Sequence, residues 1–217
     1  MRRIAFGLLS LALLLMVRSV ALASSVNVSL TNAGGVISHD GTVFVGPYQI
    51  QVGGRTFNAP CDDYFDDIGV GEHWQANEVP LTAAGVVSAL FGSNPNADHL
   101  YLEAAFLTTL FDQEPTSDYS DISYAIWGLF DSAALSSSNY DAGAAAFLLR
   151  AESAKLSFNE FAGWKILVPI DGSQSQGGRP QEFLIPAATP EPATLALLGL
   201  GLVGIGLAQR RKHGSRP

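Results

Sequence analysis

The sequence is poor in cysteine: a single residue of this type, Cys61, occurs in 217 positions. One cysteine cannot form an internal disulfide, so the fold does not depend on a disulfide framework. Three states remain open for the lone thiol: buried and inert, reactive, or paired with another molecule. We predict the first, because unpaired cysteine is among the most frequently buried residue types.

Basic residues are also scarce, and most of them lie near the two ends of the chain. Between Ser24 and Thr189 there are five basic residues against nineteen acidic ones, a net charge of −14. Nucleic-acid binding needs a cationic patch that neutralises phosphates, so this composition excludes it. The same charge favours cations or basic partners, and it helps to keep an exported domain in solution.

The chain also lacks the local motifs of the common catalytic classes. It contains no glycine-rich phosphate loop, no nucleophile elbow and no papain-type cysteine motif. We therefore predict a non-enzymatic protein with no catalytic residues and no cofactor. The alternative is a secreted hydrolase in which Cys61 is the nucleophile and His73 its base.

A secretory signal peptide is predicted over residues 1–23. Arg2 and Arg3 supply its charged start, residues 4–17 are apolar, and Ala-Leu-Ala at 21–23 forms a small-x-small cleavage site. We place the cleavage between Ala23 and Ser24. The apolar run is shorter than the ~20 residues of a spanning helix, which favours a cleaved leader over an anchor. Its partner would be the export machinery.

Residues 187–217 contain a second export feature. A polar motif, Pro190-Glu191-Pro192, precedes a charge-free segment at about 193–209, which we predict to be a single transmembrane helix. The tail at 210–217 begins with a basic cluster, formed by Arg210, Arg211 and Lys212. Such clusters stay on the cytoplasmic side, so the preceding body should lie outside the cytoplasm.

The order of these features resembles the PEP-CTERM sorting signal of Gram-negative bacteria: Pro190-Glu191-Pro192, a short span rich in Gly and Leu, and a basic end. In that family an exosortase, a membrane transpeptidase, recognises the signal. The resemblance implies that the chain is cut near the motif and passed to the cell surface or extracellular matrix. The two prolines disfavour helix, which would leave the backbone accessible to the enzyme.

Residues 24–186 are predicted to form one exported α+β domain. Alternating and β-branched residues between 26 and 61 indicate three or four antiparallel strands, with Gly53-Gly54 as a hairpin turn. Apolar periodicity predicts about four helices, one of them with Asp98 as its N-cap. Their ranges are 81–91, 98–110, 120–131 and 141–154. Two later strands, at 164–170 and 181–185, should rejoin the sheet.

The body also resembles the domains of bacterial thioester adhesins, through Cys61-Asp62 and Ala125-Ile126-Trp127. In those domains a cysteine and a glutamine form an internal thioester. The glutamine is expected two residues before the alanine, where this chain has Ser123. The resemblance therefore implies a related scaffold without the thioester.

An acidic segment follows Cys61 and supplies candidate metal ligands, Asp62, Asp63, Asp66 and Asp67. Their spacing is not that of an EF-hand loop, so we favour a solvated acidic turn over a calcium site. Trp74, Trp127 and Trp164 could form a carbohydrate platform, although buried anchors are the commoner role of tryptophan, and Trp127 is predicted to be core.

These observations predict an exported, non-enzymatic protein of the cell surface or of an exopolysaccharide biofilm matrix. Its partners would be exosortase, the membrane while the predicted C-terminal helix remains, and exopolysaccharide. The alternatives are the hydrolase described above and a module that binds calcium or a glycan.

Overall fold

Six antiparallel strands form the main sheet of the protein, in the order β5-β4-β1-β6-β7-β8. We describe residues 24–173 and 179–187 of a computed structural model. The strands are β1 (Ser24–Asn32), β4 (Tyr48–Val52), β5 (Arg55–Ala59), β6 (His73–Pro80), β7 (Lys165–Pro169) and β8 (Phe183–Ile185). A separate two-stranded hairpin pairs β2 (Val36–Ile37) with β3 (Phe44–Val45).

Strand β1 lies at the centre of the sheet, between β4 and β6. Strand β4 shows why this region forms strands: Tyr48, Ile50 and Val52 point inward, and the two glutamines between them point to solvent. The turn to β5 uses Gly53 and Gly54, both with positive φ, as two-residue hairpins require. This confirms the predicted hairpin.

The two edges of the sheet meet, so that it curls into a barrel. Cys61, just after β5, forms a bridge with Phe183 of β8. The Leu184 N–H donates to the Pro60 carbonyl, and the Asp62 N–H donates to the Glu182 carbonyl, both at 3.3 Å. Closure removes the free strand edges that would otherwise invite pairing with other chains.

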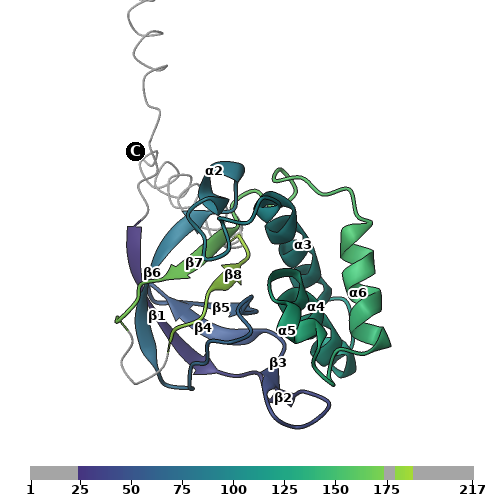
Figure 1. Cartoon of the computed structure of the whole chain (residues 1–217). Coiled ribbons are helices and arrows are strands. Elements are labelled where there is room, and N and C mark those ends of the chain that lie inside the picture. The colour runs from purple at the N-terminus through teal and green to yellow at the C-terminus, as the bar shows by residue number, and fades with distance from the viewer. Residues whose placement is uncertain (1–23, 174–178, 188–217) are drawn as a thin grey trace, which may run out of the picture.

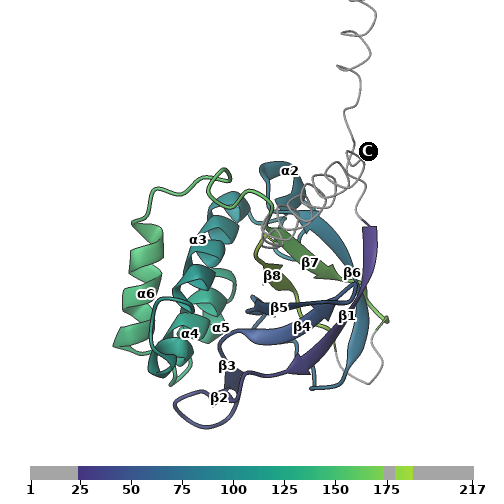
Figure 2. The same ribbon diagram turned by 180° about the vertical axis from the view of Figure 1, so that it is seen from behind.

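The helices of the described residues are inserted between β6 and β7, and they pack against one side of the barrel (Figure 1). They are α2 (Ala83–Val86), α3 (Ala97–Leu110), α4 (Tyr119–Phe130), α5 (Ser132–Leu135) and α6 (Ala142–Glu152), with a short 3₁₀ turn at Thr116–Asp118. Figure 2 shows α6 farthest from the barrel and the β2–β3 hairpin projecting beyond the sheet.

Helix α4 joins two hydrophobic clusters. Its residues Tyr124 and Trp127 pack with Trp74 and Phe183 of the barrel, whereas Ile122 and other residues of the helix pack against α3 and β7. A helix that is buried on most of its circumference is typical of the centre of a core. The prediction that Trp127 is a core residue is confirmed, since only 4% of it is exposed.

The predicted α+β architecture is confirmed at this level, and most element boundaries agree within two residues. Helix α4 matches the predicted range 120–131, and β7 and β8 match the two late strands. Strand β6 was not predicted, because its alternation of buried and exposed side chains is short. The alternation includes Trp74 and Ala76 and is then interrupted by two half-buried polar residues. Asp98 lies in the first turn of α3, and the N-cap is Asn96, so that detail was wrong.

The predicted helix at 81–91 was also wrong, because α2 ends at Val86. The N–H groups of Ser88 and Ala89 donate to carbonyls three residues back, as in a tighter turn, and the two N–H groups after them find tertiary partners. The Leu90 N–H donates to the Glu182 carboxylate at 2.8 Å, and the Phe91 N–H donates to the Tyr101 hydroxyl at 3.2 Å. These acceptors replace the carbonyls four residues back that would continue a helix.

The two targeting predictions lie outside the described residues. They are the signal peptide at 1–23 and the transmembrane segment at about 193–209. Within the described part of the chain, every helix is too short or too polar to cross a bilayer.

Candidate binding cleft

The Cys61 thiol lies in the core, between the barrel and α4. It is fully buried, and the Trp127 indole N–H lies 3.3 Å from its sulfur and 3.1 Å from its carbonyl oxygen. Burial raises the pKa of Cys61 to about 12. The thiolate, which is the nucleophilic form, is therefore strongly disfavoured, and the predicted burial of this cysteine is confirmed.

Ser123, which occupies the position of the thioester glutamine, has a structural contact of its own. Its side chain is buried, and its hydroxyl accepts the Gly46 N–H at 2.8 Å. Gly46 has positive φ and packs directly on Tyr119, at the point where the chain turns from β3 to β4. Ser123 therefore connects α4 to this turn, one helical turn before Trp127.

His73, the other half of the proposed hydrolase pair, belongs to a different surface. It lies at the start of β6, opposite Ser29 of β1. It lines a shallow hollow together with Gln51 and the Gly53-Gly54 turn. Cys61, in contrast, contacts Trp127 inside the core.

The acidic segment after Cys61 is partly buried, which corrects the expectation of a solvated turn. Asp62 is fully buried and Asp63 nearly so. Neither carboxyl oxygen of Asp62 meets an N–H or O–H donor within the described residues. Its pKa is raised by burial and by the adjacent carboxyl group of Glu182.

Glu182 is the buried partner of Asp62 and precedes β8 by one residue. Its carboxylate accepts hydrogen bonds from the Tyr101 hydroxyl and the Leu90 N–H. Burial raises its pKa to about 7. Neither Asp62 nor Glu182 forms an ion pair within the described residues. A hydrogen bond between the two carboxyl groups requires one of them to hold a proton.

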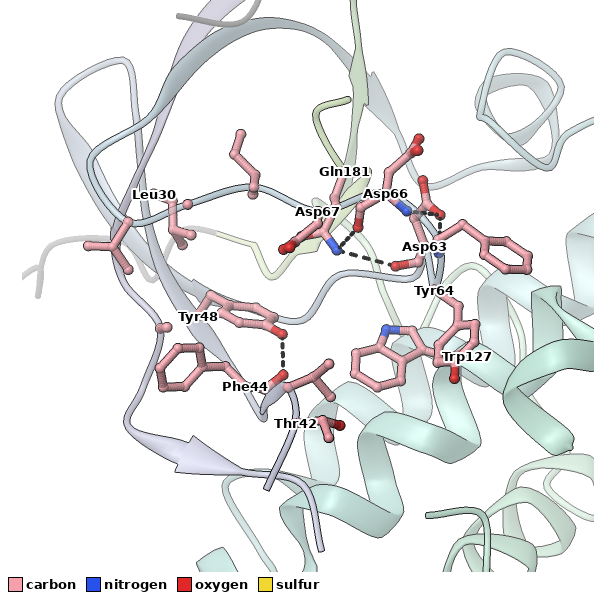
Figure 3. A pocket seen from close by; sticks show the side chains of 16 residues that line it. Leu30, Thr42, Phe44, Tyr48, Asp63, Tyr64, Asp66, Asp67, Trp127 and Gln181 are labelled. Atoms are coloured by element: carbon pink, nitrogen blue, oxygen red, sulfur yellow. Dashed lines mark hydrogen bonds between the residues drawn. The ribbon is translucent and has the colours of Figure 1, made fainter. Parts of the chain in front are cut away.

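An open cleft of about 510 Å³ lies beside this buried pair, at the mouth of the barrel (Figure 3). Its size is within the range of small-molecule sites. One side is aromatic and the other is acidic. The aromatic lining residues are Phe44, Tyr48, Tyr64, Phe65 and Trp127, and the acidic ones are Asp63, Asp66 and Asp67.

The acidic side is a turn held by a side-chain amide. Asp63 accepts the backbone N–H groups of Phe65 and Asp66. Gln181 donates its amide to the carbonyls of Asp63 and Asp66, as Figure 3 shows. Burial, followed by the nearby charge of Asp66, raises the pKa of Asp63 to about 6. The turn is therefore rigid and presents carboxylates to the cleft.

Two of these carboxylates differ in what surrounds them. Asp66 forms an ion pair with Arg179 at 3.7 Å, but the arginine is mostly exposed and the pair contributes little. Asp67 is exposed at the rim. Of the four predicted metal ligands, Asp62 faces Glu182, whereas the other three line the cleft.

The aromatic side combines a buried wall with an exposed rim. Tyr64 packs against Trp127 and Tyr124, with ring centroids 5.6 and 6.0 Å away. The Tyr48 hydroxyl donates to the Phe44 carbonyl at 2.7 Å and fixes the end of the hairpin. Phe44 and Phe65 are 48% and 69% exposed. Sequence reasoning singled out the acidic segment but missed this side, because its residues come from three separate regions.

The described domain is thus an α+β barrel with helices on one side and an aromatic and acidic cleft at its mouth. The profile of the PEP-CTERM protein-sorting motif matches residues 188–212, directly after this domain. No curated protein sequence and no solved structure matches the chain. The chain carries a PEP-CTERM sorting motif, and this motif indicates an exported protein that exosortase sorts and that associates with the membrane.

Proposed function

We propose that the protein is a non-enzymatic component of the cell surface or extracellular polysaccharide matrix, and that its cleft binds a glycan there. The sorting signal carries this proposal, because it assigns the protein to exosortase-dependent export. The cleft supplies the means of adhesion. Aromatic rings pack on the C–H faces of sugars, and carboxylates accept hydrogen bonds from hydroxyl groups.

The charge of the cleft narrows the class of glycan. Three carboxylates line it, and Asp66 alone of these forms an ion pair with a basic residue among the described residues. Polysaccharides that contain uronic acids would be repelled by these groups. We therefore propose a neutral glycan or one with free amino groups, since ammonium groups would pair with Asp67 and its neighbours.

The exposed phenylalanines give the test of this site. Replacing both Phe44 and Phe65 by alanine should weaken glycan binding by roughly fivefold to a hundredfold, because each ring loses a contact of roughly 0.5–1.5 kcal/mol. Titration of tryptophan fluorescence with oligosaccharides measures the affinity, since Trp127 lines the cleft. Leu149→Ala is the matched control, because Leu149 is similarly exposed but lies on α6.

Titration with different oligosaccharides shows which class of glycan the cleft binds. Glucosamine oligomers and neutral glucans should bind, whereas uronic-acid oligomers should not. Equal affinity of the double variant and the wild type would place the glycan elsewhere. Failure of every sugar to bind folded protein would remove the glycan proposal.

The proposed function and the hydrolase alternative predict opposite effects of the Cys61→Ala substitution. The proposed function predicts no effect. Cys61→Ala should leave glycan binding and matrix formation unchanged, because the protonated, buried thiol takes no part in either. The measurement is biofilm mass in a strain that carries the variant in place of the wild-type gene, with protein amount checked by immunoblot. Loss of matrix at normal protein amount would instead favour the hydrolase.

A further inference from the structure

Three possible metal ligands meet at a place away from the cleft's acidic turn. They are His39, from the β2–β3 loop, Asp121, from α4, and Asp141, which precedes α6. One ligand atom from each lies within 4.8 Å of the other two. His39 Nε2 and Asp121 Oδ1 are 2.9 Å apart.

A glycine makes this approach possible. Gly143 lies in the first turn of α6, and a Cβ atom there would come within 2.1 Å of Asp121 Oδ2 and 3.1 Å of Asp141 Oδ1. Any larger residue would push the Asp121 carboxylate away. The two carboxylates therefore share the space that the missing side chain leaves.

The loop that carries His39 is held on both sides. The Asp40 N–H donates to Asn139 Oδ1 at 2.9 Å, and Asn139 in turn donates to the Tyr124 hydroxyl at 2.9 Å. Inside the loop, Asp40 accepts hydrogen bonds from Ser38 and Thr42. His39 is thus presented by a fixed backbone, which is the kind of outer support that metal sites have.

Asp141 is oriented in the same way. Its Oδ1 accepts the N–H groups of Gly143 and Ala144, at 2.7 and 3.3 Å. These bonds fix the carboxyl group and leave its second oxygen for another partner. The two hydrogen bonds to Asp141 therefore orient this proposed ligand, as outer-shell hydrogen bonds do in metal sites.

Within the part of the chain that the structure describes, the two carboxylates of the cluster have no basic side chain other than His39 as an ion-pair partner. Two carboxylates at this separation repel each other, and His39 compensates for at most one of them. A divalent cation would satisfy both.

We propose that His39, Asp121 and Asp141 bind a divalent transition-metal ion of the zinc type. One imidazole nitrogen and two carboxylate oxygens form a mixed set that suits zinc and its neighbours. Calcium prefers six to eight oxygen ligands, so it fits this site poorly. Three protein ligands leave a fourth position for water or for a group on a partner molecule.

The test is calorimetric titration of the full chain, purified in detergent and stripped with a chelator, with zinc chloride. We expect one equivalent of zinc to bind, and calcium to give no heat. His39→Ala and Asp121→Asn should each weaken binding by more than the roughly tenfold to hundredfold typical of losing an outer-shell partner. His99→Ala is the matched control, because it removes an exposed histidine from α3.

Cobalt(II) provides a second measurement on the same proteins. Its visible absorption should appear in the wild type and in His99→Ala and be lost in His39→Ala, with thermal melting used to confirm that each variant folds. Zinc binding that survives in both ligand variants would overturn the proposal, as would the absence of zinc heat in folded wild-type protein. Neither result would bear on glycan binding in the cleft, which is measured separately.

Discussion

The free energy of unfolding should fall by about 3 kcal/mol as the pH rises from 4.5 to 7 because of Glu182 alone. Its pKa is about 7 in the folded protein and 4.5 ordinarily. Between these values the folded state holds a proton that the unfolded state has lost, so rising pH favours unfolding. The contribution is complete below pH 4.5 and is lost as the pH passes through 7.

The variant Asp62→Asn should flatten this pH dependence. An amide at position 62 does not titrate, so the variant lacks the proton that the folded state holds on Asp62, whose pKa is raised by burial and by Glu182. Urea unfolding at several pH values measures the effect, and Asp171→Asn, an exposed acid in the loop after β7, serves as the control. A profile that is the same in Asp62→Asn and in the wild type would show that the pair does not control stability.

Replacing Trp127 by alanine should cost about 3–5 kcal/mol of stability, the range found for large buried aromatic residues. Trp127 packs against Tyr64 and Tyr124 and connects α4 to the barrel. Trp127→Phe should cost less, about 1–3 kcal/mol, because it keeps much of the packing and leaves the Cys61 carbonyl without its donor.

Chemical denaturation of the two variants separates packing from hydrogen bonding at this position. Val87→Ala is a suitable control, since Val87 is largely exposed just after α2 and should change stability by less than about 0.5 kcal/mol. Equal losses for Trp127→Phe and Trp127→Ala would mean that the indole N–H, and not ring volume, dominates. A loss below 1 kcal/mol for alanine would contradict the assignment of Trp127 to the core.

The parts of the fold that could be predicted from the sequence are those set by neighbouring residues. The Gly53-Gly54 turn, helix α4 and strand β7 each depend on a local pattern of glycines or apolar residues. The sorting signal could be predicted for the same reason, as its features follow one another without interruption.

The parts that could not be predicted depend on distant residues. Asp62 is buried because its segment pairs with the backbone at Glu182, 120 positions later. The N–H groups of Leu90 and Phe91, beyond the end of α2, have their acceptors on the same glutamate and on Tyr101. The cleft likewise needs the hairpin, the acidic turn and α4 together. Each contact requires the closure of the barrel, and no local periodicity encodes that closure.

Strand β8 also determines how the domain bears mechanical load. The sorting motif begins at residue 188, three positions after β8 ends at Ile185. Any pull on the tail therefore reaches the domain through β8. This strand is paired with β7 on one side and joined to Pro60 and Cys61 on the other. Tension would be shared between two neighbours, so the domain should resist being unravelled from its attached end.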